Sequence, residues 1–584
     1  MKKFLATLLA AAMLCTAIAV PAVAESTEAA QETAAVTEFP RNETLYYFSG
    51  MGVLPSSFNP FVSSGGEWPA GQMQYLLYEA LFMMNMNTGE LEPLLADSYE
   101  VQDDNSVIVK INEAAHFNDG SALTAADVKF SYDLGQKYSL QYSSYWDNIA
   151  SVEIVDDYTI QIFQKEDAVN TPVVLDSMQM VPIVPEAIWG PIAEEAGDDV
   201  SVLRAFDNLE APVGSGCYKV YGFNDQGIYL ERDDNYWGVA RFGSLPNPKY
   251  IVQPIYTSNN GVAEALVAGD LDMAQAYIAQ IWNLQEQNPD IKTYIDGPPY
   301  HLAGGMVAMV YNTTLPGLDN PEVRRALAYG INYTQVAELA VSGYSALVEA
   351  MLALPDGVED KYINRDEIAE LQWSYDPDKC NELLDALGAE RGDDGIRVLP
   401  DGTRMSWSIQ TGYGWTDWNA AAEVISQNLA ECGVEIISDM PESAVFISNR
   451  QTGSFELCLN IIGENPRPSQ PWFRYKDTLY TTGVPVGEMA FSNYGRYSNA
   501  EIDALIDKIP SLTDEAELTE AHTTLTKLFL EDAAVVPIMY RPFQFYDLNE
   551  SVWKNFPTQE NGSTTPPMLD RGAGIRFLWE ITAE

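Results

Sequence analysis

The chain has 584 residues and a formal net charge of −52, with 46% hydrophobic and 20% charged residues. This hydrophobic content predicts sizeable packed cores and excludes wholesale disorder. The strong negative charge excludes binding to phosphate backbones and electrostatic docking on anionic lipid. The acidity is typical of a soluble protein and is compatible with a neutral ligand. The length corresponds to about three to four domains, although nothing in the pattern demands more than two or three compact units.

The N-terminus carries the features of an export signal. Lys2 and Lys3 precede an apolar run over residues 4–20, and Ala22 and Ala24 form a small–x–small cleavage pattern. We predict that a signal peptide is removed after Ala24. The protein is then expected outside the cytoplasm, at the cell surface or in the periplasm.

Two alternatives to cleavage remain open. The apolar run approaches the ~18 residues of a spanning helix, so an uncleaved anchor is the main rival. A lipid anchor on Cys15 is a weaker alternative, because Leu14 stands where a small residue is usual. Residues 25–39 follow the predicted signal peptide of residues 1–24. Because they are rich in Ala, Thr and Glu without apolar periodicity, they predict a flexible tether.

Strand and helix patterns then alternate along the chain, which predicts a mixed α/β fold. Strand patterns occupy residues 41–50, 106–112, 159–165, 227–233 and 434–440. Helix patterns occupy residues 74–84, 123–136, 320–332, 376–388, 417–433, 498–509 and 515–532. Thr124 is predicted as an N-cap with Asp127 completing a capping arrangement, and Pro321 and Pro377 suit first helical positions.

The sequence holds no motif of a common catalytic site. We find no phosphate-binding glycine loop, no G-x-S-x-G elbow and no H-E-x-x-H pair, and the three histidines are scattered. The adjacent Asp233 and Asp234 could serve a glycosidase only if they lay ~5–9 Å apart across a substrate. With 84 acidic residues, that adjacency carries almost no information. We therefore predict a protein that is not an enzyme, with no metal and no cofactor.

Four cysteines follow the predicted signal peptide, and none has C-x-x-C spacing. Cys380 and Cys432 fall in helix patterns and Cys458 in a strand pattern, while Cys217 lies between patterns. Export permits disulfides. Burial as small apolar residues is the favoured interpretation, and the disulfide state stays open.

Several segments, taken in order, resemble landmarks of one family, the large solute-binding proteins of ABC importers that include oligopeptide, dipeptide and oligosaccharide binders. The matching segments run from about residue 45 to 545 and are LYEALFMMNMNTGELEPLLADSYEV, HFNDGSALTAADVKFSYD, PVGSGCYKVYGFNDQGIYLERDDNYWG, VRRALAYGIN, NYGRYSNAEIDALID and LEDAAVVPIMY. Each is weak alone, but the ordered set is specific.

The resemblance implies a two-lobed periplasmic-binding-protein-like fold of the large, three-subdomain type. Lobe one would take residues 40–300, with a subdomain inserted over about 75–205, and residues 541–584 would return to it. Lobe two would take residues 301–540. Two hinge crossings would join the lobes and close them on the solute. The resemblance also implies a monomer that delivers its solute to permease subunits with cytoplasmic ATPases, and no nucleic-acid partner.

The ligand class is the open question. A peptide binder of this family usually anchors the ligand's α-ammonium with an Asp after a lobe-two strand, because burying an unpaired cation is costly. Here Asn465 stands at that place, although a shift by one residue would put Glu464 there. Asparagine suits a neutral hydroxyl better than a cation. The segment GYGWTDW also resembles oligosaccharide-binding members. We therefore favour an oligosaccharide, with a peptide, or a non-transport sensor on the same scaffold, as alternatives.

Sugar binding would use aromatic faces for the C–H-rich side of a pyranose and polar groups for its hydroxyl rim. The candidate ligand-binding residues are Trp68, Tyr413, Trp415, Asp417, Trp418, Asn465 and Trp472. Trp415 precedes a helix in a glycine-flanked loop, which favours a ligand role. Trp68 and Trp472 lie in loops and are open between ligand and packing roles.

Two members of this set have simpler structural interpretations. Trp418 begins the stripe of positions 418, 421, 425, 429 and 432 on its helix, which favours a core position. Asp417 is explained most simply as a first-turn acid that interacts favourably with the helix dipole, and a hydroxyl contact is the second interpretation.

Overall fold

The computed structural model describes residues 39–49, 57–62, 74–256, 258–349, 354, 359–463, 467–542, 545–561, 565–569 and 572–583. The predicted signal peptide and residues 25–38 of the predicted tether lie outside this set. Residues 39–584 form one compact unit. Among the described helices, none has the combined length and apolar character required to cross a bilayer.

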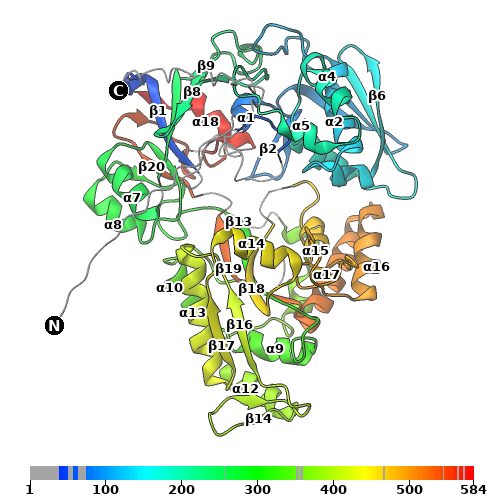
Figure 1. The fold of residues 1–584 in the computed structure, drawn as a ribbon, viewed down its shortest axis with the longest axis vertical. Helices are drawn as coiled ribbons and strands as arrows, with labels where there is room; N and C mark the ends of the chain where they lie inside the picture. Colours follow the sequence, from blue (N-terminus) through cyan, green and yellow to red (C-terminus); the bar gives the residue numbers. More distant parts are fainter. Residues whose placement is uncertain are drawn as a thin grey trace, which may run out of the picture. The chain divides into compact units, whose positions relative to one another are not determined.

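A seven-stranded mixed sheet collects strands from both ends of the chain (Figure 1). Its order is β12-β20-β11-β1-β10-β9-β8. The strands are β1 (Thr44–Ser49), β8 (Tyr218–Asn224), β9 (Gly227–Arg232), β10 (Tyr250–Pro254), β11 (Met273–Gln275), β12 (Ile291–Lys292) and β20 (Asp547–Asn549). β1 runs parallel to β10 on one side and to β11 on the other. Its nearly continuous burial is typical of a strand covered on both faces.

A five-stranded sheet in the order β17-β16-β18-β13-β19 forms the centre of the second half of the chain. Its strands are β13 (Ala303–Tyr311), β16 (Ser406–Gln410), β17 (Glu435–Asp439), β18 (Leu457–Ile462) and β19 (Val535–Pro542). The helices of this region are α9 (Pro321–Tyr329), α10 (Tyr333–Ala340), α11 (Arg365–Ile368), α12 (Pro377–Ala386), α13 (Thr416–Glu431), α14 (Ser443–Thr452), α15 (Trp472–Leu479), α16 (Ala500–Lys508) and α17 (Glu515–Asp532).

A four-stranded antiparallel sheet in the order β4-β5-β7-β6 belongs to residues inserted between β1 and β8. Its strands are β4 (Ala96–Val101), β5 (Val107–Ile111), β6 (Ile149–Asp156) and β7 (Thr159–Gln164). The helices of this insertion are α2 (Ala125–Lys137), α3 (Thr171–Met180), α4 (Glu186–Ala196) and α5 (Val200–Ala205).

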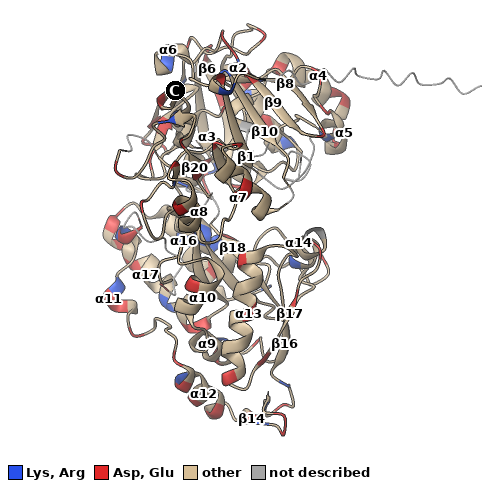
Figure 2. Ribbon diagram, turned by 90° about the vertical axis from the view of Figure 1, so that its left-hand side faces the viewer, with Lys and Arg blue, Asp and Glu red and all other residues tan. Residues whose placement is uncertain are grey.

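The remaining elements are short. The paired strands are β2 (Phe82–Met84) with β3 (Leu91–Pro93), β14 (Glu390–Arg391) with β15 (Arg397–Val398), and β21 (Trp553–Lys554) with β22 (Thr582–Ala583). The other helices are α1 (Gln74–Leu77), α6 (Val239–Phe242), α7 (Asn259–Ala268), α8 (Ile281–Gln287) and α18 (Phe577–Glu580). Figure 2 shows acidic residues spread over many helices and loops, an arrangement that favours solubility.

Helix starts follow the predicted capping chemistry. The Asn320 side chain accepts a hydrogen bond from the Glu322 backbone N–H at 3.0 Å, and Pro321 occupies the first helical position of α9. Thr124 and Asp127 form the predicted capping box at the start of α2. These starts are predictable because each depends on neighbouring residues only.

The helix predicted over residues 74–84 is wrong beyond its first turn, since α1 ends at Leu77 and residues 82–84 form β2. The Leu77 carbonyl accepts a hydrogen bond from the Gly216 backbone N–H at 3.0 Å. Gly216 is required for this approach, because a Cβ there would lie 2.1 Å from the Leu76 carbonyl oxygen. A segment distant in sequence thus takes the acceptor that a continuing helix would use.

Two segments of the family resemblance, one with Glu79 and one over residues 212–238, meet at one buried carboxyl group. Glu79 accepts hydrogen bonds from the Tyr236 hydroxyl and, at 2.8 Å, from the Trp237 indole N–H. The Ser215 hydroxyl accepts a hydrogen bond from the Glu79 backbone N–H at 3.4 Å. Burial raises the pKa of Glu79 to about 8. This cluster ties α1 to the strands that follow residue 212.

Candidate functional site

The stretch 411–418 forms the turn that leads from β16 into α13. Gly414 adopts a positive φ of 82°, and Trp415 is the N-cap residue of α13. Gly412 lies directly against the Trp415 ring, where a Cβ would come within 2.8 Å of the indole. The two glycines therefore shape the turn by backbone conformation and close approach.

The rings of this stretch lie in different environments. The Trp418 side chain is buried, and the other positions of its predicted stripe are buried with it. Trp415 is half-buried and packs edge-on against Trp418, with ring centroids 4.9 Å apart, and against Phe446 at 5.3 Å. Tyr413 is 66% exposed. Of the three predicted rings, Tyr413 and Trp415 retain surface that a ligand could contact.

Asp417 lies in the first turn of α13, as the sequence pattern indicates, and its side chain is buried. Its Oδ2 atom is 3.4 Å from Nε of Arg541, the last-but-one residue of β19. The Arg541 guanidinium lies 5.3 Å from the centre of the Phe545 ring. The charge of Asp417 is therefore balanced by a cation and by the positive end of the helix dipole.

The other three predicted ligand-binding residues are Trp472, which lies in a different helix, and Trp68 and Asn465, which the structure does not describe. Trp472 begins α15 and is buried, and its indole N–H donates to the Ile506 carbonyl at 2.7 Å. Lys476 lies over the same ring at 5.3 Å. Trp68 and Asn465 fall outside the described residues. A ligand role for these three residues stays a prediction.

Three uncharged polar side chains gather where the parallel strands of the seven-stranded sheet end. Ser49 is the last residue of β1 and is paired with Gln275, the last residue of β11. Gln253 is the last-but-one residue of β10, and its amide N–H donates to the Ser49 carbonyl. All three residues are more than nine-tenths buried. Open α/β sheets bind ligands at this carboxyl edge, on either side of the strand where the order reverses.

The orientation of both amides follows from their partners. The Ser49 carbonyl can only accept, so Gln253 turns its N–H toward that carbonyl and leaves Oε1 on the other side. The Tyr47 hydroxyl donates to Oε1 of Gln275 and leaves Nε2 on the other side. Within the described chain, Ser49 Oγ, Gln253 Oε1 and Gln275 Nε2 have no hydrogen-bond partner. The set therefore offers one hydroxyl, one acceptor and one donor, without charge.

The sequence pattern did not identify these three residues, because serine and glutamine are common and carry no motif. Only their positions at the ends of β1, β10 and β11 could have indicated a shared site. That indication requires knowing beforehand that these strands pair in parallel. Buried polar atoms without a partner are rare in folded proteins and call for an explanation by function.

A line of contacts joins this edge to the N-terminus of α13. Tyr277 follows Gln275 by two residues, and its ring lies 5.6 Å from that of Phe545. The electrostatic effect of Asp417 contributes to raising the pKa of Tyr277, after the larger effect of burial. Phe545 in turn contacts Arg541, the partner of Asp417. We call the sheet edge that carries Ser49, Gln253 and Gln275 the uncharged edge, and the turn of residues 411–418 the aromatic turn. These contacts show that the two belong to one connected region.

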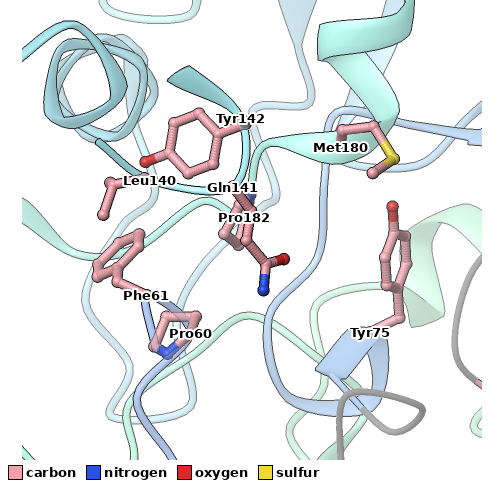
Figure 3. Close-up of a pocket in the computed structure, with 8 residues that line it drawn as sticks. All are labelled: Pro60, Phe61, Tyr75, Leu140, Gln141, Tyr142, Met180 and Pro182. Atoms are coloured by element: carbon pink, nitrogen blue, oxygen red, sulfur yellow. The ribbon is translucent and has the colours of Figure 1, made fainter. Parts of the chain in front are cut away.

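A separate small cavity lies in the inserted region and is lined by Pro60, Phe61, Tyr75, Leu140, Gln141, Tyr142, Met180 and Pro182 (Figure 3). The Gln141 amide projects into its middle. Its volume of about 30 Å³ accommodates roughly one water molecule and no sugar ring.

A known protein family matches more than half of this chain. Residues 90–482 match the model of a family described as bacterial extracellular solute-binding proteins, family 5 Middle. Heme-binding protein A of Haemophilus influenzae is 25% identical over 554 residues, covering 90% of this chain and 93% of that protein. The glutathione-binding protein GsiB of Pectobacterium atrosepticum is 25% identical over 448 residues, covering 75% and 78% respectively.

Among solved structures, a mannohexaose-bound periplasmic oligopeptide-binding protein of an oligopeptide ABC transporter from Thermotoga maritima superposes with a TM-score of 0.81. It is 28% identical in sequence, and the match covers 94% of this chain and all of that one. This likeness confirms the predicted mixed α/β, periplasmic-binding-protein-like fold of the large type.

Proposed function

Because this chain belongs to the bacterial extracellular solute-binding proteins of family 5, we propose that it captures a neutral oligosaccharide for an ABC importer. Membership makes the chain a binding component that works outside the cytoplasmic membrane, and it agrees with the prediction that the chain is not an enzyme. The ligand class is the part of the proposal that goes beyond family membership.

The observation that carries the proposal is the uncharged set of Ser49, Gln253 and Gln275. A sugar hydroxyl both donates and accepts, and this set supplies a hydroxyl, an acceptor and a donor at one edge. Tyr413 and Trp415, at the start of α13, would provide aromatic faces for the C–H-rich side of the sugar. The mannohexaose bound by the Thermotoga maritima protein supports this ligand class.

An oligopeptide is the second candidate, because the same Thermotoga maritima protein is described as oligopeptide-binding and the related GsiB of Pectobacterium atrosepticum is a glutathione-binding protein. A peptide's α-ammonium requires an available carboxylate when it is buried. Asp417 is the carboxylate within the turn of residues 411–418, and Arg541 already balances its charge. This balance disfavours a peptide terminus at that position.

Calorimetric titration separates the two ligand classes. We expect cello-, xylo- or manno-oligosaccharides to bind with micromolar or tighter affinity and a mixed peptide pool to give no response. Ligand at about 100 times its Kd should stabilise the folded state by about 2.7 kcal/mol and raise the melting temperature. Peptide binding without any response to sugars would refute the proposal.

A substitution then tests the uncharged edge directly. Gln275→Leu keeps the size of the side chain and removes the free Nε2 donor, so sugar affinity should fall by about 3- to 10-fold, the value of one neutral hydrogen bond. Gln287→Leu is the matched control, because Gln287 is exposed on α8 of the same part of the chain. Equal affinities for the two variants would exclude Gln275 from the site.

A further inference from the structure

A pair of cysteines with free thiols lies where the end of α13 approaches the start of α12. Cys380 lies in the first half of α12, and Cys432 follows the last residue of α13. Both side chains are fully buried. The other two described cysteines, Cys217 and Cys458, are buried in different elements.

The Cys432 sulfur lies against the first turn of α12, the helix that carries Cys380. Cys432 Sγ lies 3.9 Å from the Pro377 carbonyl oxygen. Pro377 and Cys380 are three residues apart, so they share one face of α12. The Cys380 thiol also donates a hydrogen bond to the Cys432 sulfur, and this contact is the main cause that raises the pKa of Cys380 and lowers that of Cys432.

Two arginines hold the backbone around Cys432 against α12. Arg397 donates from Nε to the Cys432 carbonyl at 2.8 Å and from Nη2 to the Asn381 side chain at 2.9 Å. Arg391 donates from Nη2 to the Glu431 carbonyl at 2.9 Å and to the same Asn381 oxygen at 3.0 Å. Because Asn381 is the neighbour of Cys380 in α12, these bonds limit the movement of one cysteine relative to the other.

We propose that Cys380 and Cys432 are a disulfide-forming pair, which cross-links α12 to the end of α13 after export. A disulfide requires adjacent thiols whose Cβ atoms can approach to about 3.8 Å, and the hydrogen-bonded thiols meet the first condition. Family membership places the chain outside the cytoplasm, where disulfides form and persist.

The oxidant is a disulfide, either of low molecular weight or carried by a thiol oxidoreductase. The Cys432 thiolate attacks one sulfur of that disulfide and forms a mixed disulfide, and the other sulfur leaves as a thiolate. The Cys380 sulfur then attacks Cys432 Sγ, which forms the Cys380–Cys432 bond, and the second thiolate leaves and takes up the Cys380 proton. Arg391 and Arg397 favour the first step because their positive charges stabilise the Cys432 thiolate.

Mass spectrometry of the full chain tests the pairing. The purified protein is incubated with oxidised glutathione, alkylated with iodoacetamide in denaturant and digested without reductant. We expect the peptides containing Cys380 and Cys432 to be joined, with alkylated Cys217 and Cys458. Alkylation of all four cysteines, or glutathione on Cys380 and Cys432 in place of a mutual bond, would overturn the proposal.

Thermal unfolding gives a second readout. A cross-link that closes a loop of about 50 residues should raise the melting temperature by about 3–4 °C relative to the protein reduced with a phosphine. The Cys380→Ala/Cys432→Ala variant should not respond to the phosphine. The matched Cys217→Ala/Cys458→Ala variant should keep the full response. A native melting temperature that is the same with and without the phosphine contradicts the cross-link.

Discussion

Replacing Glu79 with glutamine should remove a large part of the pH dependence of stability. Burial raises the pKa of this carboxyl from its ordinary value near 4.5 to about 8. Between these two values the folded state holds a proton that the unfolded state has released, so stability is full below pH 4.5 and falls as pH rises through 8. Glutamine resembles the protonated carboxyl, because its oxygen can accept from Trp237 and its amide can donate to the Tyr236 hydroxyl.

The expected magnitude follows from these pKa values. For Glu79 alone, raising the pH from 6 to 8 should lower the free energy of unfolding by about 2 kcal/mol. Asp176 and Asp272 act in the same direction, because burial raises their pKa values to about 7 and about 6. Together they add roughly 2 kcal/mol over the same window. The native protein should therefore lose about 4 kcal/mol and the Glu79→Gln variant about half of that.

Urea unfolding followed by tryptophan fluorescence at pH 6, 7 and 8 measures this difference. Groups other than Glu79 are common to both proteins, so their contributions cancel when the two pH profiles are subtracted. Parallel profiles for the native protein and the variant would show that Glu79 is ionised in the folded state at pH 6, and would refute the reasoning. A variant that is less stable than the native protein at pH 6 yet shows a flatter profile would still agree with it.

Three further predictions concern the turn of residues 411–418 and a buried ion pair. Trp415→Ala should weaken oligosaccharide binding by about 1–3 kcal/mol in calorimetry, and unchanged affinity would leave its ring with a packing role only. In contrast, Trp418→Ala should cost about 3–5 kcal/mol of stability, because that ring is buried. Arg474→Met should lower the free energy of unfolding by about 3–5 kcal/mol in urea, since it leaves the buried Glu359 carboxylate without its bidentate partner. The control Lys379→Met, in an exposed ion pair, should change the free energy of unfolding by no more than about 0.5 kcal/mol. Equal losses for Arg474→Met and Lys379→Met would contradict the expectation that the buried ion pair matters more than the exposed one.

Much of the secondary structure was predictable because its causes are local. The start of α9 depends on Asn320 and Pro321, which lie next to each other in the chain. The stripe that begins at Trp418 indicates its own burial through helical spacing alone, and the structure confirms it. The first-turn position of Asp417 is predictable for the same reason.

The candidate site depends on contacts that no local pattern contains. The helix predicted over residues 74–84 ends early because Gly216, far along the chain, takes the Leu77 carbonyl. The position of Arg541 beside Asp417 likewise requires β19 to end near the start of α13. Neither partner can be identified from the residues on either side of it.

The sequence by itself determined the family, the mixed α/β class, the helix starts and the buried stripe of α13, since each follows from neighbouring residues or from an ordered set of motifs. Only the tertiary structure decided that Ser49, Gln253 and Gln275 meet at one edge with their free atoms uncharged. Parallel pairing of β1 with β10 and β11 joins residues more than two hundred positions apart. Such pairing depends on the packing of the whole sheet, and a local run of residues does not encode it.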